Sequence, residues 1–252
     1  MSAIVPAMIS ARLRALTPAR VGLGRTGVSQ QTRDLLAFQS AHAQARDAVY
    51  AQLNPGAMAA ALSEITGASV LRLHSAAEDR PSYLQRPDKG RLLNSASRTT
   101  LEEFTAANGS PGDLALVVAD GLSALAVERH AALLIRALLQ RIPDWTVSPV
   151  SLVEQGRVGV GDAIGELTGV PCCLVLIGER PGLSSPDSLG AYITWAPRIG
   201  RTDAERNCVS NIRSEGLSYE QAALQIAYYL TEARRRQLTG VELKIADRAL
   251  KG

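Results

Sequence analysis

The chain has 252 residues, of which 46% are hydrophobic and 20% are charged, and its formal net charge is +3. This composition is that of an ordinary globular protein and argues against a disordered chain. The small net charge and an aromatic content of 4% argue against a nucleic-acid surface, which needs clustered cations and stacking platforms. No apolar stretch reaches the length of a membrane span, so no membrane partner is expected.

Cysteine and histidine usage bears on redox and metal chemistry. The three cysteines, Cys172, Cys173 and Cys208, are odd in number and lack C-x-x-C spacing, which favours a reducing compartment over a disulfide framework. The three histidines are far apart and form no H-E-x-x-H pair, so the sequence predicts no metal ligand. The stretch up to Leu16 lacks the continuous apolar core of a signal peptide, and the protein is predicted to be cytosolic.

The first hundred residues are predicted to be mainly helical, because their apolar residues recur at helical spacing. Glycine and proline punctuate this region and mark where helices end. The predicted elements are a helix over 32–49 with Ser29 or Thr32 as its N-cap, a helix over 57–65 that ends at Gly67, a strand over 69–74 and a loop over 75–90.

From about Leu101 onward, strand patterns alternate with helix patterns. Two continuous apolar runs indicate strands that are buried on both faces. Ser123 is placed to cap the helix that follows it, and Ser218 and Gln221 fit a capping box at the start of the last helix. The basic run 234–236 is expected at the carbonyl end of that last helix. The predicted elements are strands over 114–119, 146–153, 172–177 and 191–195, and helices over 123–140, 162–167 and 218–239.

Strands that alternate with helices favour an open, mostly parallel sheet. The predicted fold class is therefore α/β, with an N-terminal mainly helical region followed by a Rossmann-like, mostly parallel open sheet that carries helices on both faces. The boundary between the two regions is predicted between residues 95 and 96, which gives segments 1–95 and 96–252.

The segment Gly22–Gly27 matches the dinucleotide-binding pattern G-x-G-x-x-G, but its context argues against such a site. The fingerprint needs a strand before it and a helix that opens inside it. Pro18 lies only three residues before Val21, and the predicted helix begins well after Gly27. The pattern therefore predicts a glycine-rich turn.

Two of the predicted buried strands end in polar or flexible turns, at Asp120-Gly121 and at the loop Gly178–Gly190. In open α/β sheets, ligands bind in the crevice outside the carboxyl ends of the strands. A surface ion pair between Glu179 and Arg180, or another arginine, is the simpler interpretation of that carboxylate. Both interpretations stay open on the residue pattern alone.

Several segments, in order, resemble the ethanolamine ammonia-lyase small-subunit family. The resemblance runs from about Arg20 to about Gly240, and motifs in the right order are more specific than any single glycine pattern. The matching segments are 178–189 (GERPGLSSPDSL), 156–158 with 162–166, 206–212 (RNCVSNI), 119–123 (ADGLS), and 20–21 with 24–25.

The resemblance implies assembly with a barrel-shaped large subunit, with adenosylcobalamin held between the two subunits. Homolysis of the cobalt–carbon bond would start a radical rearrangement of ethanolamine to acetaldehyde and ammonia, in a substrate pocket that belongs to the large subunit. The cobalamin-binding positions of the family fall on Val158, Glu179 and Cys208, the last expected on a loop. No catalytic residue is expected on this chain, and the isolated chain is expected to be inactive.

Further expectations follow from the same resemblance. Residues 1–95 would be a subunit-docking region and residues 96–252 a cobalamin-binding domain. The motif D-x-H-x-x-G is absent, so the cofactor is expected to keep its own dimethylbenzimidazole on cobalt. The protein is expected in the cytoplasm, within a bacterial microcompartment in some relatives, although the segment before Arg20 is shorter than the leader linked to such packaging.

Two other functions are compatible with the residue pattern. One is a free-standing α/β enzyme that binds a nucleotide at the same crevice, with Asp120 and Glu179 as polar contacts. The other is an assembly adaptor whose crevice has no chemistry.

Overall fold

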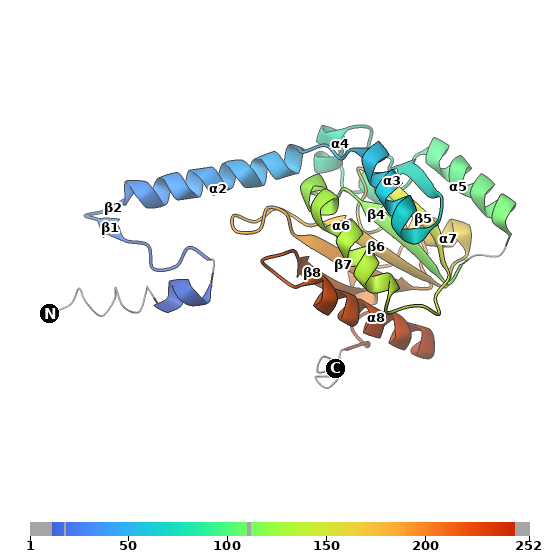
Figure 1. Ribbon diagram of the computed structural model, residues 1–252. Helices are drawn as coiled ribbons and strands as arrows, with labels where there is room; N and C mark the ends of the chain where they lie inside the picture. Colours follow the sequence, from blue (N-terminus) through green and yellow to red (C-terminus); the bar gives the residue numbers. More distant parts are fainter. Residues whose placement is uncertain (1–11, 18, 110–111, 245–252) are drawn as a thin grey trace.

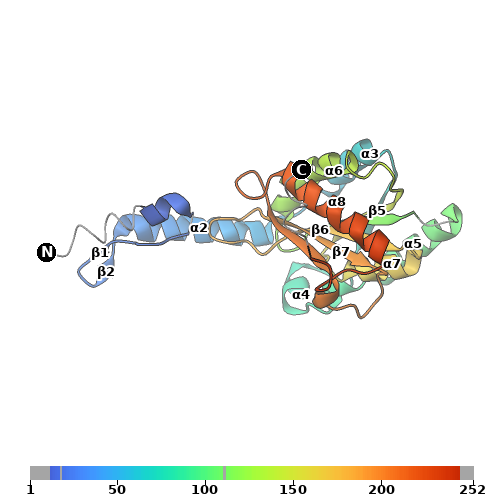
Figure 2. The same cartoon turned by 90° about the horizontal axis from the view of Figure 1, so that it is seen from below.

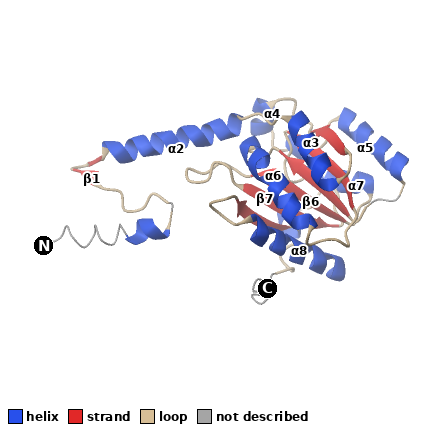
Figure 3. Cartoon of the chain, viewed as in Figure 1, coloured by secondary structure: helices blue, strands red, loops and turns tan. Residues whose placement is uncertain are grey.

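The computed structural model describes residues 12–17, 19–109 and 112–244. Most of the segment before Arg20, on which the predictions about a signal peptide and a packaging leader depend, lies outside the described residues. A six-stranded sheet carries helices on both faces (Figures 1 and 3), so the predicted α/β fold class is confirmed. Within the described ranges, no helix is long and apolar enough to cross a membrane.

An N-terminal arm, defined here as residues 12–17 and 19–50, extends away from the sheet (Figures 1 and 2). It contains a small hairpin of β1 (Arg25–Thr26) and β2 (Ser29–Gln30), followed by the long helix α2 (Thr32–Tyr50). Gly27, in the turn of the hairpin, has a φ angle of +63°. The G-x-G-x-x-G segment is therefore a glycine-rich turn, as predicted, and no helix opens inside it.

The predicted N-cap of α2 was wrong. Gln31 occupies the N-cap position and makes no side-chain hydrogen bond there. Ser29 is unavailable because it belongs to β2, where it pairs with Thr26, and Thr32 is already the first residue of the helix.

The sheet has the strand order β3-β5-β4-β6-β7-β8. The first four strands in this order are parallel, and β7 and β8 extend the sheet as antiparallel strands. Because β3 pairs along its length with β5, the first 95 residues contribute an edge strand to the sheet, and the boundary at 95/96 stays a prediction. The strands are β3 (Val70–His74), β4 (Leu114–Ala119), β5 (Val147–Glu154), β6 (Cys172–Gly178), β7 (Leu189–Trp195) and β8 (Asn207–Ile212).

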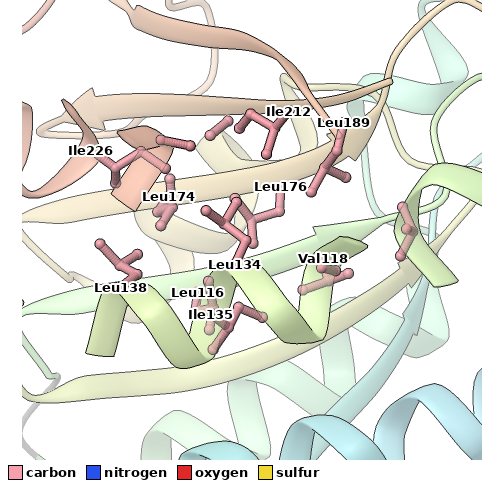
Figure 4. Packing of buried hydrophobic residues seen from close by; sticks show 14 of the residues in the cluster. Leu116, Val118, Leu134, Ile135, Leu138, Leu174, Leu176, Leu189, Ile212 and Ile226 are labelled. Atoms are coloured by element: carbon pink, nitrogen blue, oxygen red, sulfur yellow. The ribbon is translucent and has the colours of Figure 1, made fainter. Parts of the chain in front are cut away.

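Two hydrophobic cores cover the two faces of the sheet, because successive strand residues point to opposite sides. Side chains of α3 (Pro55–Thr66), α6 (Ala124–Leu139) and α8 (Tyr219–Arg236) form one core, of which Figure 4 shows the part around Leu134, Leu174 and Ile226. Side chains of α5 (Ser95–Asn108) and α7 (Val160–Thr168) form the other.

Capping residues fix several helix ends where the sequence predicts them. The side chains of Ser123 and Ser218 accept hydrogen bonds from the backbone N–H three residues later, at the start of α6 and α8. Gly67 ends α3 in the left-handed conformation. The basic run 234–236 lies in the last turn of α8, as predicted.

Two parts of the fold differ from the prediction. Residues 75–90 are not a loop, because they contain α4 (Arg80–Gln85) and the start of a 3-10 turn, η1 (Lys89–Arg91). Asp79 caps α4 by accepting from Ser82 N at 2.8 Å, and Pro81 lies in the first turn, where a helix tolerates proline. Cys208 lies on strand β8 rather than on a loop.

Candidate functional site

The topology opens a crevice at the carboxyl edge of the sheet. The chain leaves β4 for α6 on one face, whereas it leaves the neighbouring strand β5 for α7 on the other face. Such a divergence is where open α/β sheets bind ligands. The two strand ends are joined across the crevice by a hydrogen bond from Gly156 N to Asp120 Oδ1, 3.1 Å long.

The turn after β4 packs directly against the end of β6. Leu122 N donates to Gly178 O at 2.9 Å, and Gly121 has a φ angle of +59°. A Cβ on Gly121 would lie 2.3 Å from Gly178 O, which is closer than any side chain tolerates. Glycine at this position therefore allows the turn after β4 to lie against the end of β6, from which Glu179 projects.

Glu179 follows β6 directly, and neutral donors orient its carboxylate. Asn211 N donates to Oε2 at 3.2 Å, the Ser188 hydroxyl donates to the same oxygen, and Glu179 N donates to Ser188 O at 2.9 Å. The carboxylate lies over Gly190, where a Cβ would be 2.9 Å from Oε1. Among the described residues Glu179 forms no ion pair with Arg180 or another arginine, so the simpler interpretation of this carboxylate was wrong.

A groove of about 420 Å³, here named the edge groove, joins Glu179 to Val158. Val158 lies in the connection between β5 and α7 and is half-buried. The lining of the edge groove is formed by Tyr83, Leu122, Arg157, Val158, Ile177, Gly178, Glu179, Arg180 and Tyr192.

Cys208 joins this region through Tyr192, its direct partner across β7 and β8. Cys208 is exposed on the strand, yet the surrounding protein desolvates its sulfur enough to raise the pKa of the thiol, against a hydrogen bond with Tyr192 that lowers it. Burial likewise raises the pKa of Tyr192. The edge groove thus brings Val158 and Glu179 together. Cys208 is not part of its lining, but it pairs with Tyr192, which is, at the level of Val175 within β6.

A stack of one aromatic ring and two guanidinium groups contributes to the wall of the edge groove, whose lining includes Tyr83 and Arg157. Arg80 and Arg157 lie over the ring of Tyr83, at 4.7 and 4.5 Å from its centroid. Tyr83 also donates from its hydroxyl to Gly156 O at 3.2 Å. Burial raises the pKa of Tyr83 to about 12, so the phenol keeps its proton and this hydrogen bond.

Arg80 ties three separate segments together. Its Nε donates to Val49 O at 2.7 Å, at the end of α2, and its Nη1 donates to Gly121 O at 2.7 Å. It also lies 3.9 Å from the carboxylate of Asp120. Burial nevertheless raises the pKa of Asp120 to about 6, because the carboxylate is almost fully removed from solvent.

The alternation of strands and helices predicts the crevice, but Tyr83, Arg80 and Tyr192 belong to no motif that points to a site. Tyr192 carried a usable signal, because it alternates with buried residues along β7 and therefore had to face the opposite side from Ala191 and Ile193. Tyr83 and Arg80 lay in the segment that the prolines marked as a loop. No set of three or more His, Cys, Asp or Glu side chains within the described ranges is arranged to hold a metal ion.

Comparison with known proteins identifies the family. The model of the ethanolamine ammonia-lyase light chain (EutC) matches residues 8–244. The ethanolamine ammonia-lyase small subunit of Azotobacter vinelandii is 58% identical over 92% of this chain and 87% of its own length. Those of Xanthomonas campestris pv. campestris and Pseudomonas syringae pv. tomato are each 57% identical, over 96% and 92% of this chain and 90% and 81% of their own lengths. The chain therefore belongs to the ethanolamine ammonia-lyase small-subunit family.

Proposed function

We propose that this chain assembles with the large subunit of an adenosylcobalamin-dependent ethanolamine ammonia-lyase and holds part of the cofactor at the interface between them. The complex would convert ethanolamine to acetaldehyde and ammonia. The observation that carries the proposal is that Val158 and Glu179 line one groove, while Cys208 pairs with Tyr192 of the same lining, so three separate segments of the chain meet there.

The residues present fit one side of a corrinoid. The Glu179 carboxylate is held by two neutral donors through Oε2. Its Oε1 accepts no hydrogen bond from the described residues and can accept from the amide groups on the rim of the corrin ring. Val158 offers an apolar contact and backbone groups, and Cys208 offers a small polarisable surface. When bound, adenosylcobalamin supplies the radical that starts the reaction by homolysis of its cobalt–carbon bond.

The size of the edge groove supports a shared site. Its volume of about 420 Å³ lies toward the small end of pockets that enclose a drug-sized ligand, about 300–1,000 Å³, and a corrinoid is larger than such ligands. This chain therefore contacts one portion of the cofactor, and the large subunit covers the rest and provides the substrate pocket.

The arm is the docking surface that we propose within residues 1–95. On α2, Leu35, Leu36 and Phe38 are exposed by 43%, 58% and 42%, on a helix that projects away from the sheet (Figure 1). Contiguous apolar groups on a protruding element mark protein–protein contacts. The three cysteines are free thiols, which supports a reducing location such as the cytoplasm or a microcompartment within it.

Co-expression with the large subunit tests the proposal. The purified complex is expected to release ammonia from ethanolamine when adenosylcobalamin is added and to release none without it. The chain purified alone is the matched control and is expected to be inactive with or without the cofactor. Cobalamin-dependent turnover by the chain alone, or an active large subunit that never binds this chain, would refute the proposal.

A further inference from the structure

A second and larger cavity adjoins the edge groove. It measures about 810 Å³ and is lined by three segments, 87–92, 157–162 and 199–206. Arg157 and Val158 line both cavities, so a ligand that contacts Val158 lies at the junction between them. We name this second cavity the arginine pocket, after the four arginines in its lining, which are Arg91, Arg157, Arg201 and Arg206.

Two of these arginines are already neutralised within the chain. Arg206 forms a buried ion pair with Asp162, with Nη1 and Nη2 donating to the two carboxylate oxygens at 2.6 and 2.5 Å. Burial alone would lower the pKa of Arg206, but these hydrogen bonds raise it. Arg201 pairs with Glu205, one turn away.

The remaining acids of the lining also have cationic neighbours. Asp88 pairs with Arg86 at 2.7 Å. Asp203 lies 3.7 Å from Nε of Arg206 and is largely exposed to solvent. The acidic groups of the pocket are therefore associated with cations other than Arg91 and Arg157.

Arg91 and Arg157 carry the uncompensated positive charge. Among the described residues the guanidinium of Arg91 forms no hydrogen bond or ion pair, and its aliphatic stem lies against Gly159, where a Cβ would be 3.2 Å from Arg91 Cβ. Arg157 donates from Nη2 to Tyr83 O at 2.9 Å, stacks on the Tyr83 ring and, within the described ranges, forms no ion pair with a carboxylate. Its Nε is buried without a hydrogen-bond partner in the described chain, and such a donor is costly to leave unpaired.

We propose that Arg91 and Arg157 form a phosphate subsite that binds the phosphodiester of the cofactor's nucleotide tail. The inference rests on the proposed function and extends it to a part of the ligand that Glu179 does not reach. Cobalamin carries neutral amides around its corrin ring and a single anionic phosphodiester in its tail. A guanidinium matches the geometry of phosphate oxygens, and the junction at Val158 places the two arginines next to the groove that takes the corrin rim.

The test uses the complex with the large subunit and three probes that differ in the tail. Adenosylcobalamin has the full nucleotide, adenosylcobinamide phosphate keeps a phosphate but lacks the nucleotide, and adenosylcobinamide lacks both. Binding is followed by equilibrium dialysis, with the corrin absorbance as readout, for the wild type and for Arg91→Gln and Arg157→Gln. Arg91→Gln is the cleaner variant, because the guanidinium of Arg91 makes no hydrogen bond or ion pair with the described residues. Arg157→Lys keeps the positive charge but removes the guanidinium stack on Tyr83.

The two Gln variants are expected to bind adenosylcobalamin and adenosylcobinamide phosphate about tenfold more weakly or worse, and adenosylcobinamide with unchanged affinity. Arg157→Lys should retain most of the affinity, and the affinity of the wild type for both phosphate-bearing probes should fall with salt. Arg236→Gln is the matched control, because it removes an exposed arginine from α8 on the opposite face of the sheet.

Equal weakening of all three probes, or no weakening, would overturn the phosphate subsite while leaving the proposed function in place. Variants that dissociate the subunits without changing the affinity of the intact complex would also overturn it, because the arginines would then pair with carboxylates of the large subunit. A wild-type complex that binds none of the three probes would instead refute the proposed function itself.

Discussion

Gly121 and Gly178 are in direct backbone contact at the carboxyl edge of the sheet, where the amide that follows Gly121 donates to the carbonyl oxygen of Gly178 at 2.9 Å. A Cβ on either glycine would overlap backbone oxygen atoms, at 2.3 Å for Gly121 and 2.0 Å for Gly178. Backbone atoms at this spacing have no room to move, because two central strands of the sheet hold them in place.

Gly121→Ala is expected to lower the free energy of unfolding by about 3 kcal/mol or more, since it combines a steric overlap with a left-handed φ angle. Gly169→Ala is the matched control. Gly169 has a φ angle of +72°, but a Cβ added there would meet no atom within 4 Å, so only the backbone strain of about 1–2 kcal/mol applies. Urea unfolding measures both losses, and equal losses would show that the contact with Gly178 is unimportant.

The loop that carries Glu179 is fastened to α6. Arg129 Nη1 donates to Asp187 Oδ2 at 2.8 Å, and the Ser123 hydroxyl donates to Pro186 O at 2.9 Å. Asp187→Ala is expected to increase hydrogen exchange in residues 180–188 and to lower global stability by about 1–3 kcal/mol, because Asp187 also lies 3.4 Å from Nε2 of the buried His130. Glu78→Ala, which removes an exposed carboxylate elsewhere, should leave exchange in this loop unchanged. An unaltered loop in Asp187→Ala would argue that Ser123 alone holds it.

Asp120 should make the stability of the chain depend on pH. Burial raises its pKa from 3.8 to about 6 in the folded state, so its contribution is most favourable below pH 4 and is lost as the pH rises through 6. This difference between the folded-state and unfolded-state pKa of Asp120 corresponds to about 3 kcal/mol in the free energy of unfolding. Relative to the wild type, Asp120→Asn should therefore gain stability between pH 4 and pH 6 and keep a constant difference above pH 7. A difference that does not change with pH would show that Asp120 titrates normally.

Two substitutions at Glu179 distinguish the loss of one hydrogen bond to the cofactor from steric blocking of the edge groove. Glu179→Gln keeps one oxygen for the Asn211 amide, so cobalamin binding by the assembled complex should weaken only severalfold, as for the loss of one polar contact of about 0.5–1.5 kcal/mol. Glu179→Trp fills the groove and should reduce binding far more. Wild-type affinity in a correctly assembled Glu179→Trp complex would place the cofactor elsewhere.

Cys208 offers a chemical footprint of the same site. It is exposed, whereas Cys172 and Cys173 are buried, so iodoacetamide should label Cys208 selectively in the folded complex. Labelling should be slow at neutral pH because the pKa of the thiol is raised, and it should accelerate as the pH increases. Bound adenosylcobalamin should protect Cys208, and protection is measured by mass spectrometry of the tryptic peptide. Equal labelling with and without the cofactor would separate Cys208 from the site.

The sequence predicted the elements whose local pattern agrees with their final environment. The strands β4 and β6 are continuous apolar runs, and both are buried on both faces. Strand β8 was not predicted, because exposed polar residues such as Ser210 and Asn211 interrupt its apolar positions. The helix α4 was missed because Pro81 suggests a break, although proline is well tolerated in a first helical turn.

The candidate site was only partly predictable for a related reason. Alternation of strands and helices located the crevice, but the resemblance to a known family supplied Val158, Glu179 and Cys208. Contacts between distant segments, such as the opposition of Tyr192 and Cys208, depend on the register of two antiparallel strands. No local pattern encodes that register when one of the two strands is itself unrecognised.

Arg80 gives the arm a mechanical connection to the sheet. One guanidinium group is bonded both to Val49 O, in the last turn of the arm's helix, and to Gly121 O, beside the end of β6. A tilt of α2 is therefore transmitted through Arg80 to the turn at Gly121, which lies against the end of β6. In an assembly that binds the arm, the orientation of the arm helix and the position of the turn at Gly121 are coupled through the two hydrogen bonds of Arg80.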